Sequence, residues 1–393
     1  MSQHKRIFFP NLDGLRFFAF FSVFLFHSFF TKNLAIQENQ VFATLRWLTR
    51  PGDIGVNFFF VLSGFLITFL LLSERQLTGR IAIAAFYMRR VLLIWPLYFV
   101  VVLIGFVVFP WLKSHFGETA SHEPAKLWYY LAFLANFNTL YNGSNTPTLT
   151  LLWSVAVEEQ FYLVWPLLVA AVPSRKMGWL FGAVLVMSLV FRAGHTHELK
   201  VLNFHTFSLI GDMALGGLVA WLCWRDDRLT TAVARWPRWA IGAGYLAGTM
   251  LIYSHEALIG HLPGYIVFDR LVLALFCAFV LLEQNYAQHS LFKMSQLRFP
   301  TYWGTYTYGL YCLHFLALLA AYQILHRLHL NDTVTGAVLG DNALGLFIAL
   351  AMSWASFNWY EKPFLKLKER FAFISRDKTN APTPLATADV GRG

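Results

Sequence analysis

The sequence predicts an all-α polytopic membrane protein with about ten transmembrane helices plus a re-entrant or interfacial helix, and three observations support this prediction. Hydrophobic residues make up 57% of the 393-residue chain, charged residues only 13%, and the mean hydropathy is +0.51. A soluble domain carries about 25% charged residues. Long apolar runs continue to about residue 358 with only short polar segments between them. Basic residues gather in alternate segments, as they do on the cytoplasmic side of membrane proteins.

The spans follow from length, because a hydrocarbon core about 30 Å thick needs about 20 mainly apolar residues in a helix. The runs that meet this requirement are approximately 15–32, 55–73, 91–111, 151–172, 177–193, 205–224, 239–254, 264–283, 304–326 and 337–358. With the N-terminus inside, the cytoplasmic segments hold 21 of the 31 Lys and Arg residues. This asymmetry predicts that both termini are cytoplasmic. The net charge of +10 therefore reflects membrane orientation, and no nucleic-acid partner is expected.

We expect one integral membrane domain over residues 1–374. The chain becomes polar and rich in small residues after it, which predicts a disordered cytoplasmic tail over 375–393. The first apolar run has no small-residue cleavage site and should remain as a helix. Residues 128–137 form an aromatic amphipathic stretch that is too short to span, and we assign the re-entrant or interfacial helix to them. The outer loop 33–54 is a second candidate wall of an extracytoplasmic site.

Arg16 and His27 lie in the first apolar run, residues 15–30. Eleven residues at about 100° each bring both side chains to one helix face, roughly 16 Å apart along the axis. Ionisable side chains at membrane depth are costly, so by default they mark a functional site that faces the protein interior. The alternative for Arg16, together with Asp13, is anchoring at the cytoplasmic interface. The alternative for His27 is a structural hydrogen bond.

Two consecutive carboxylates, Glu158 and Glu159, lie inside another apolar run. Their side chains point about 100° apart on a helix, so at most one can readily face a given site. The face of the first carboxylate also carries Ser154, Tyr162 and Trp165. We predict that this face points inward.

Three further patches contain candidate residues. Ser63 and Gly64 offer a small surface for close helix packing, and Ser63 lacks the local base that a nucleophile needs. Arg89 and Arg90, at a cytoplasmic helix end, can hold phosphates through forked hydrogen bonds, with positive-inside anchoring as the alternative. His314 is either a functional or a structural histidine. No carboxylate or cysteine lies at ligand spacing from the loop histidines, so no metal is expected.

Taken in order, five stretches resemble the membrane acyltransferase-3 family, integral membrane acyltransferases that O-acetylate surface polysaccharides and related glycans. The matching stretches are LDGLRFFAFFSVFLFH (12–27), GVNFFFVLSGFLIT (55–68), FYMRRVLLIWPLY (86–98), LLWSVAVEEQFYLVWPLL (151–168) and YTYGLYCLHF (306–315). Each stretch alone is a weak signal, but five in the family's order are specific.

The resemblance implies ten spans plus a partial one, a cytoplasmic acyl-CoA donor and an acceptor hydroxyl on the far side. His27 matches the histidine held essential for transfer, and Arg16 matches its signature partner. Arg89 and Arg90 match the basic motif thought to bind the coenzyme's phosphates. Glu158 matches the acidic position of the fourth stretch.

The chain departs from the family pattern at one position. The family usually carries an arginine three residues before the proline of the third stretch, and Leu93 stands there in this chain. Either Arg89 and Arg90 suffice for the donor, or the donor is held less tightly or differently. The family's frequent C-terminal hydrolase-like extension is not expected here.

We therefore expect a membrane O-acyltransferase that moves an acyl group, acetyl by default, from acyl-CoA to a hydroxyl of an extracytoplasmic or lipid-linked glycan. No cofactor should be tightly bound, and a bacterial-type inner membrane is the expected location. A sugar hydroxyl is a poor nucleophile, so His27 is expected to take its proton as general base. Glu158 would orient the base or the acceptor, and Arg16 would lie near the pantetheine arm. Direct transfer and a covalent acyl-histidine intermediate both stay open.

The rival interpretation is a glycan or lipid transporter or a proton-coupled flippase. Intramembrane Arg, His and Glu residues also build proton relays. The sequence shows no inverted repeat and no matching pair of helices broken by Gly or Pro, which many transporters contain.

Overall fold

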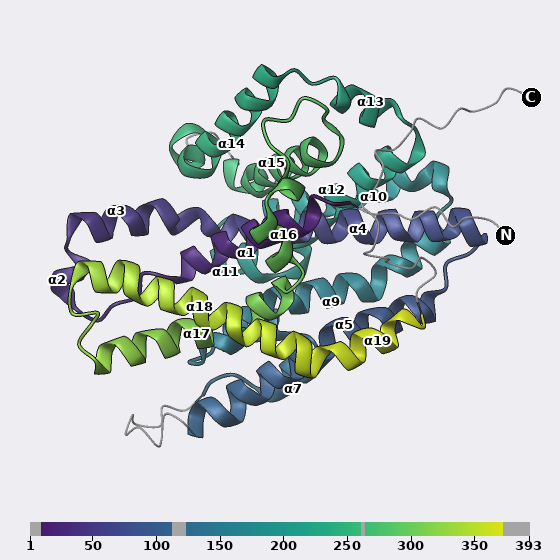
Figure 1. Cartoon of the computed structure of the whole chain (residues 1–393). Coiled ribbons are helices and arrows are strands. Elements are labelled where there is room, and N and C mark those ends of the chain that lie inside the picture. Colours follow the sequence, from purple (N-terminus) through teal and green to yellow (C-terminus); the bar gives the residue numbers. More distant parts are fainter. Residues whose placement is uncertain (1–8, 112–122, 261–263, 372–393) are drawn as a thin grey trace, which may run out of the picture.

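The computed structural model describes residues 9–111, 123–260 and 264–371, and over these residues the chain is built from helices without strands. Figure 1 shows the long helices crossing the molecule side by side, with α2 and α3 at one end of the bundle and α19 at the other. The expected tail, 375–393, lies outside the described residues.

Within the described residues, ten helices of fifteen residues or more form the bundle. They are α1 (Leu12–His27), α4 (Ile54–Thr78), α5 (Ile83–Leu103), α9 (Pro147–Ala171), α10 (Met177–Gly194), α12 (Thr206–Arg225), α14 (Arg238–Ile259), α15 (Tyr265–Tyr286), α17 (Thr307–Arg327) and α18 (Asp341–Ala355). Shorter helices connect or flank them. These are α2 (Leu34–Gln37), α3 (Gln40–Thr49), α7 (Leu127–Leu131), α8 (Ala135–Tyr141), α11 (Leu199–Phe204), α13 (Arg228–Ala234), α16 (Arg298–Gly304) and α19 (Lys362–Glu369). The 3₁₀ turns η1 (Arg50–Asp53), η3 (Ser174–Lys176) and η4 (Met294–Gln296) and the π-helical turns η2 (Ile104–Val108), η5 (Gly336–Gly340) and η6 (Ser356–Glu361) complete the described elements.

Within the described residues, seven continuous helical stretches are long and apolar enough to cross a membrane. They are Gln40–Thr78, Ile83–Trp111, Ser174–Gly194, Leu199–Arg225, Tyr265–Tyr286, Thr307–Arg327 and Gly336–Glu369. The other three expected spans coincide with α1, α9 and α14. These helices do not meet both requirements for crossing a membrane, sufficient length and sufficient hydropathy. An all-helical protein with several spans is therefore confirmed, whereas the count of ten and the orientation of the termini stay predictions.

Two outer segments differ from the expectation. The aromatic stretch 128–137 is divided between α7 and α8, because Phe133 takes a left-handed backbone conformation with φ 54° between them. The first half is tied to α5, since the Tyr98 hydroxyl donates to the Tyr130 carbonyl at 2.9 Å. The outer loop 33–54 is helical, and the side chains of Asn33 and Asn39 accept backbone N–H groups at the starts of α2 and α3.

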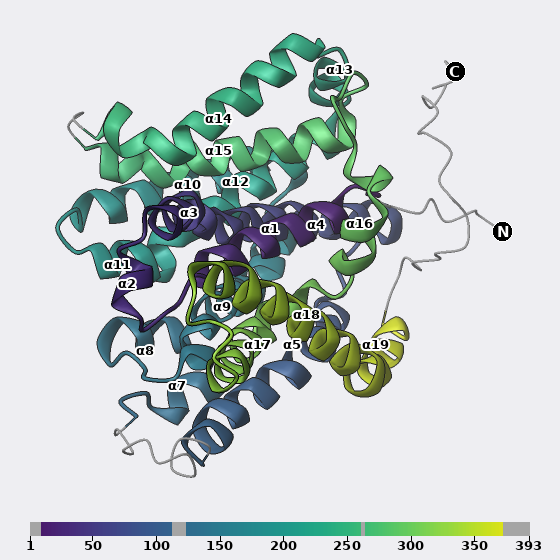
Figure 2. The ribbon, with the colours of Figure 1, turned by 60° about the vertical axis from the view of Figure 1, so that its left-hand side comes forward.

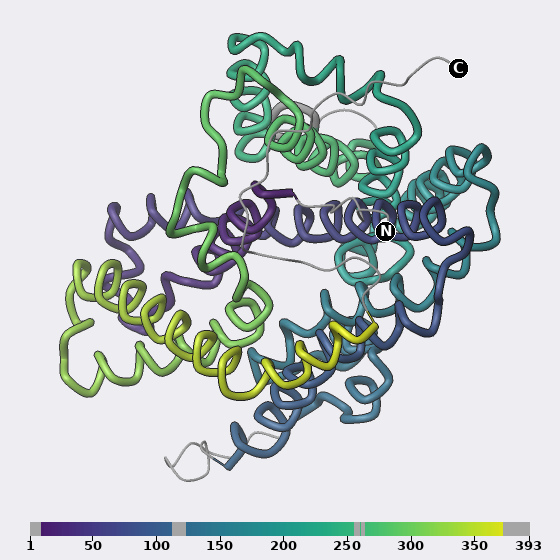
Figure 3. The backbone as a smooth tube through the Cα atoms, turned by 45° about the vertical axis from the view of Figure 1, so that its right-hand side comes forward, coloured from purple at the N-terminus to yellow at the C-terminus, as the bar shows by residue number. Residues whose placement is uncertain are grey.

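The helices lie in three tiers. Figure 2 shows α14 and α15 in one outer tier, α1, α4, α10 and α12 in the middle, and α5, α9, α17 and α18 in the other outer tier. Figure 3 shows the chain returning late in the sequence, so that α19 lies beside α5. The helix α1 contacts both α4 and α17, which brings the first and fifth family-like stretches together.

The most extensive helix pair, α4 with α12, depends on glycine. A Cβ atom at Gly64 would overlap the Met213 carbonyl, and one at Gly216 would overlap the Val61 carbonyl. Such close backbone approach is typical of small residues at helix interfaces in membranes. The predicted packing surface at Gly64 is confirmed.

We expect Gly64→Ala to lower the thermal stability of the protein in detergent, by about 1–3 kcal/mol, because the added methyl group separates two backbones. Gly182→Ala in α10 is the matched control, since a Cβ there meets nothing within 4 Å. The measurement is the unfolding midpoint of each variant. A Gly64→Ala midpoint equal to that of the control would contradict this account of the α4–α12 contact.

Candidate active site

Two histidines far apart in the sequence meet inside the bundle. His27 is the last residue of α1, and His314 lies in α17. The Nδ1 atom of His27 is 3.1 Å from the Nε2 atom of His314. His314 is completely buried, and His27 is half-buried. The predicted candidates His27 and His314 therefore share one site.

Tyr311 connects the histidine pair to α9 through two hydrogen bonds. The Nδ1 atom of His314 is 2.7 Å from the carbonyl oxygen of Tyr311, one turn earlier in α17. The hydroxyl of Tyr311 is 2.6 Å from that of Ser154 in α9. The sequence reasoning did not name Tyr311 as a candidate, although it lies inside the fifth family-like stretch.

A second polar cluster lies on the same face of α9. Ser63 donates to Glu158 Oε1 at 2.7 Å, and the Tyr162 hydroxyl donates to Ser63 Oγ at 3.1 Å. Glu158 is four residues from Ser154, which is about 6 Å along a helix axis. Tyr162, Ser154 and Trp165 are all buried, so this face of α9 points inward, as predicted. Within the described contacts Glu158 bonds Ser63 rather than His27.

Glu159 points to a different neighbour. Its Oε2 atom accepts a hydrogen bond from the Trp95 indole in α5 at 2.9 Å. Glu158 bonds a residue of α4 instead. The prediction that the two carboxylates diverge is confirmed.

The two adjacent arginines have different surroundings. Arg89 donates to Glu74 at 3.2 Å and to the Phe371 carbonyl at 2.7 Å. The guanidinium of Arg90 lies 5.5 Å from the centre of the Tyr162 ring, and its buried Nε atom has no hydrogen-bond partner within the described residues. Both residues precede Leu93, whose side chain packs against the main hydrophobic core.

Arg16 pairs locally. Its Nη1 atom is 2.9 Å from Asp13 Oδ1, one turn earlier in α1, and 29% of its side chain is exposed. Arg16 and His27 belong to one helix, but they lie in different parts of it: Arg16 near its start, His27 at its end. The structure therefore gives the two candidates separate surroundings.

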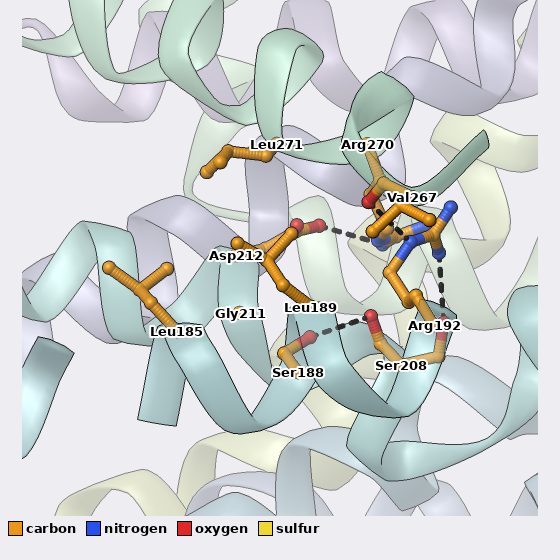
Figure 4. A pocket seen from close by; sticks show the side chains of 10 residues that line it. All are labelled: Leu185, Ser188, Leu189, Arg192, Ser208, Gly211, Asp212, Val267, Arg270 and Leu271. Atoms are coloured by element: carbon orange, nitrogen blue, oxygen red, sulfur yellow. Dashed lines mark hydrogen bonds and ion pairs between the residues drawn. The ribbon is translucent and has the colours of Figure 1, made fainter. Parts of the chain in front are cut away.

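A further charged cluster was not anticipated. Figure 4 shows Arg192 of α10, Asp212 and Ser208 of α12 and Arg270 of α15 turned toward one another. Arg192 pairs with Asp269 at 2.6 Å, and Arg270 pairs with Asp212 at 2.7 Å. The cavity between them, of about 10 Å³, has room for one water molecule at most. The sequence signal for this cluster was the carboxylate of Asp212, which lies inside an apolar run. The cluster joins the helices α10, α12 and α15.

These features define a multi-pass helical membrane protein with a polar site enclosed by its helices. The sequence model of the acyltransferase-3 family, described as an acyltransferase domain, matches residues 9–357, and the chain belongs to this family. No solved structure matches the chain.

Three relatives are named O-acetyltransferases. The peptidoglycan O-acetyltransferase OatA of Listeria monocytogenes is 24% identical over 335 residues, covering 80% of this chain and 50% of the relative. The O-acetyltransferase OatA of Staphylococcus aureus is 31% identical over 188 residues, covering 46% and 28%. A provisionally named O-acetyltransferase of Staphylococcus aureus strain COL is 29% identical over 236 residues, covering 56% and 36%. The chain thus spans half or less of the length of these relatives.

We expect Arg89→Met to destabilise the protein, because it leaves the buried carboxylate of Glu74 without its ion pair. Breaking one side of such a pair costs about 3–5 kcal/mol. The double variant Arg89→Met with Glu74→Gln removes the orphaned charge and should recover much of the loss. Unfolding midpoints in detergent measure both effects, and a single variant as stable as the wild type would show that the pair has no structural role.

Proposed function

We propose that this protein is a membrane O-acetyltransferase that moves an acyl group, acetyl by default, from cytoplasmic acyl-CoA to a hydroxyl of an extracytoplasmic or lipid-linked glycan. Membership in the acyltransferase-3 family supports the reaction class. The names of the relatives support O-acetyl transfer, and the relative from Listeria monocytogenes is named for peptidoglycan, which supports a cell-wall glycan as acceptor. The observation that carries the proposal is the contact between His27 and the buried His314.

His27 is the general base of the proposed reaction. The acceptor oxygen attacks the thioester carbonyl while its proton passes to the imidazole of His27. The carbon–sulfur bond then breaks, and the proton passes from the imidazolium to the departing thiolate. The products are the acetyl ester and free coenzyme A, so atoms and charge balance without a further reactant. A neutral imidazole suits this exchange because its two nitrogens can accept and donate at once.

A line of polar side chains supports a route for the donor through the bundle. Arg90 lies against the Tyr162 ring, Tyr162 bonds Ser63, and Ser63 bonds Glu158. One turn further along α9, Ser154 bonds Tyr311, beside the histidine pair. We assign the coenzyme's phosphates to the arginine end of this line and its thin pantetheine arm to the polar groups between the two ends.

The remaining candidates have supporting roles in this proposal. The unpartnered Nε atom of Arg90 suits a phosphate oxygen, whereas Arg89 is already engaged with Glu74. Glu158 orients polar groups of the arm through Ser63. Arg16, held by Asp13, is a second contact for the arm on the cytoplasmic side.

The direct test is the release of free CoA from acetyl-CoA by the purified protein in lipid, with and without cell-wall glycan fragments. We expect glycan-dependent release by the wild type and none by His27→Ala. His326→Ala, at an exposed position of α17, is the control that should keep full activity. Release that survives in His27→Ala would exclude His27 as the base. Glycan movement without thioester consumption would favour the transporter interpretation.

We expect Arg90→Met to raise the KM for acetyl-CoA by about tenfold or more, because a charge-assisted hydrogen bond contributes about 1.5–3 kcal/mol. The value of kcat should change much less, since the arginine is remote from the reacting atoms. Arg175→Met is the matched control, because it also removes one positive charge but from an exposed position in η3. Equal KM values for both variants would remove Arg90 from the donor site.

A further inference from the structure

The contacts of the histidine pair determine where its protons lie. The Nδ1 atom of His314 faces the carbonyl oxygen of Tyr311 at 2.7 Å. A carbonyl oxygen can only accept, so this Nδ1 atom carries a proton. In a neutral imidazole the other nitrogen then has no proton, and the Nε2 atom of His314 is an acceptor.

The protonation state of His314 in turn influences which nitrogen of His27 carries a proton. The Nδ1 atom of His27 lies 3.1 Å from that acceptor. The hydrogen bond forms only if His27 carries its proton on Nδ1, and a neutral ring then has its lone pair on Nε2. The backbone carbonyl of Tyr311 thus favours, through His314, the form of His27 whose basic nitrogen is Nε2; the His27 side chain also has a backbone hydrogen-bond partner at Val23, one turn earlier in α1.

A charged His314 would reverse the donor and acceptor, but its surroundings oppose that state. The ring centre of His314 is 5.9 Å from that of Phe20 and 5.3 Å from that of Phe315, and the ring is completely buried. Neither His27 nor His314 makes an ion pair with the described carboxylates. A buried cation without a counter-ion costs far more than a neutral ring that is fully hydrogen-bonded.

We propose that His314 is a positioning residue that holds His27 in the Nδ1-protonated tautomer, so that Nε2 is the nitrogen that takes the acceptor's proton. The inference rests on the proposed function, because it assigns the tautomer of that reaction's base. When Nε2 of His27 gains the acceptor's proton, Nδ1–H remains bonded to His314, and the bond strengthens with the positive charge. His314 itself neither gains nor loses a proton.

One feature favours the imidazolium that His27 becomes, and a second restricts its ring. His27 ends α1, and the unpaired carbonyls at a helix C-terminus favour a positive charge. The ring of Phe315 lies 4.4 Å from the His27 ring centre and limits its rotation. The surroundings of His27 therefore restrict both the orientation of its ring and its tautomer.

The first experiment compares His314→Gln with His314→Phe in the CoA-release assay. A Gln side chain can accept from His27 Nδ1–H, whereas Phe fills the space without an acceptor. Losing an orienting partner of a functional histidine typically costs about 10- to 100-fold. We expect this loss in kcat for His314→Phe and substantial recovery in His314→Gln at equal unfolding midpoints. Full kcat in His314→Phe would overturn the inference.

The second experiment reads the tautomer directly. Histidine labelled with ¹⁵N distinguishes Nδ1–H from Nε2–H by NMR of the protein in lipid, and His27→Gln identifies the His27 signals. We expect the Nδ1–H form in the wild type and a shift toward Nε2–H in His314→Phe. A wild-type His27 protonated on Nε2 overturns the inference even if CoA release depends on His27. If no CoA is released by the wild type, the proposed function fails, and the NMR result alone decides the tautomer.

Discussion

The constraint on which the structure depends is that an apolar bundle offers buried polar groups little water, so they need partners within the protein, and several find them on another helix. His27 of α1 meets His314 of α17, and Ser63 of α4 meets Glu158 of α9. Each contact satisfies a polar group and also fixes how two helices lie against each other. The residues available for chemistry are thus the same residues that hold the helices in register.

The helix α9 connects the two parts of the candidate site. Its inward face presents Ser154 to Tyr311, beside the histidine pair, and Glu158 to Ser63, while Glu159 turns to α5. A helix with its polar groups at intervals of four residues places them at successive depths of about 6 Å. In the proposed function, this spacing suits the long, thin acyl-CoA donor, which would pass from the arginines to the histidines. The charged cluster around Arg192, in contrast, encloses almost no space, and its charges pair with one another.

The fold gives the adjacent residues Arg89 and Arg90 different surroundings, although the sequence alone does not distinguish them. Arg89 forms an ion pair with the buried Glu74. Arg90 lies near the rings of Phe86 and Tyr162, and its Nε atom has no hydrogen-bond partner among the described residues. Arg89 therefore stabilises the helix junction, and in the proposed function Arg90 binds the coenzyme's phosphates. Leu93, at the position where the family usually has an arginine, packs against the core and offers no donor.

The sequence by itself determined the helical class, the positions of the apolar runs and the inward face of α9, because hydropathy and helical periodicity are local properties. It also marked His27 and Glu158 as candidates, since ionisable residues in apolar runs are visible without a structure. The tertiary structure decided that His314 pairs with His27 and that Glu158 bonds Ser63. It also divided the aromatic stretch into α7 and α8 at Phe133. These outcomes depend on contacts between helices far apart in the chain or on a single backbone angle, which no local pattern encodes.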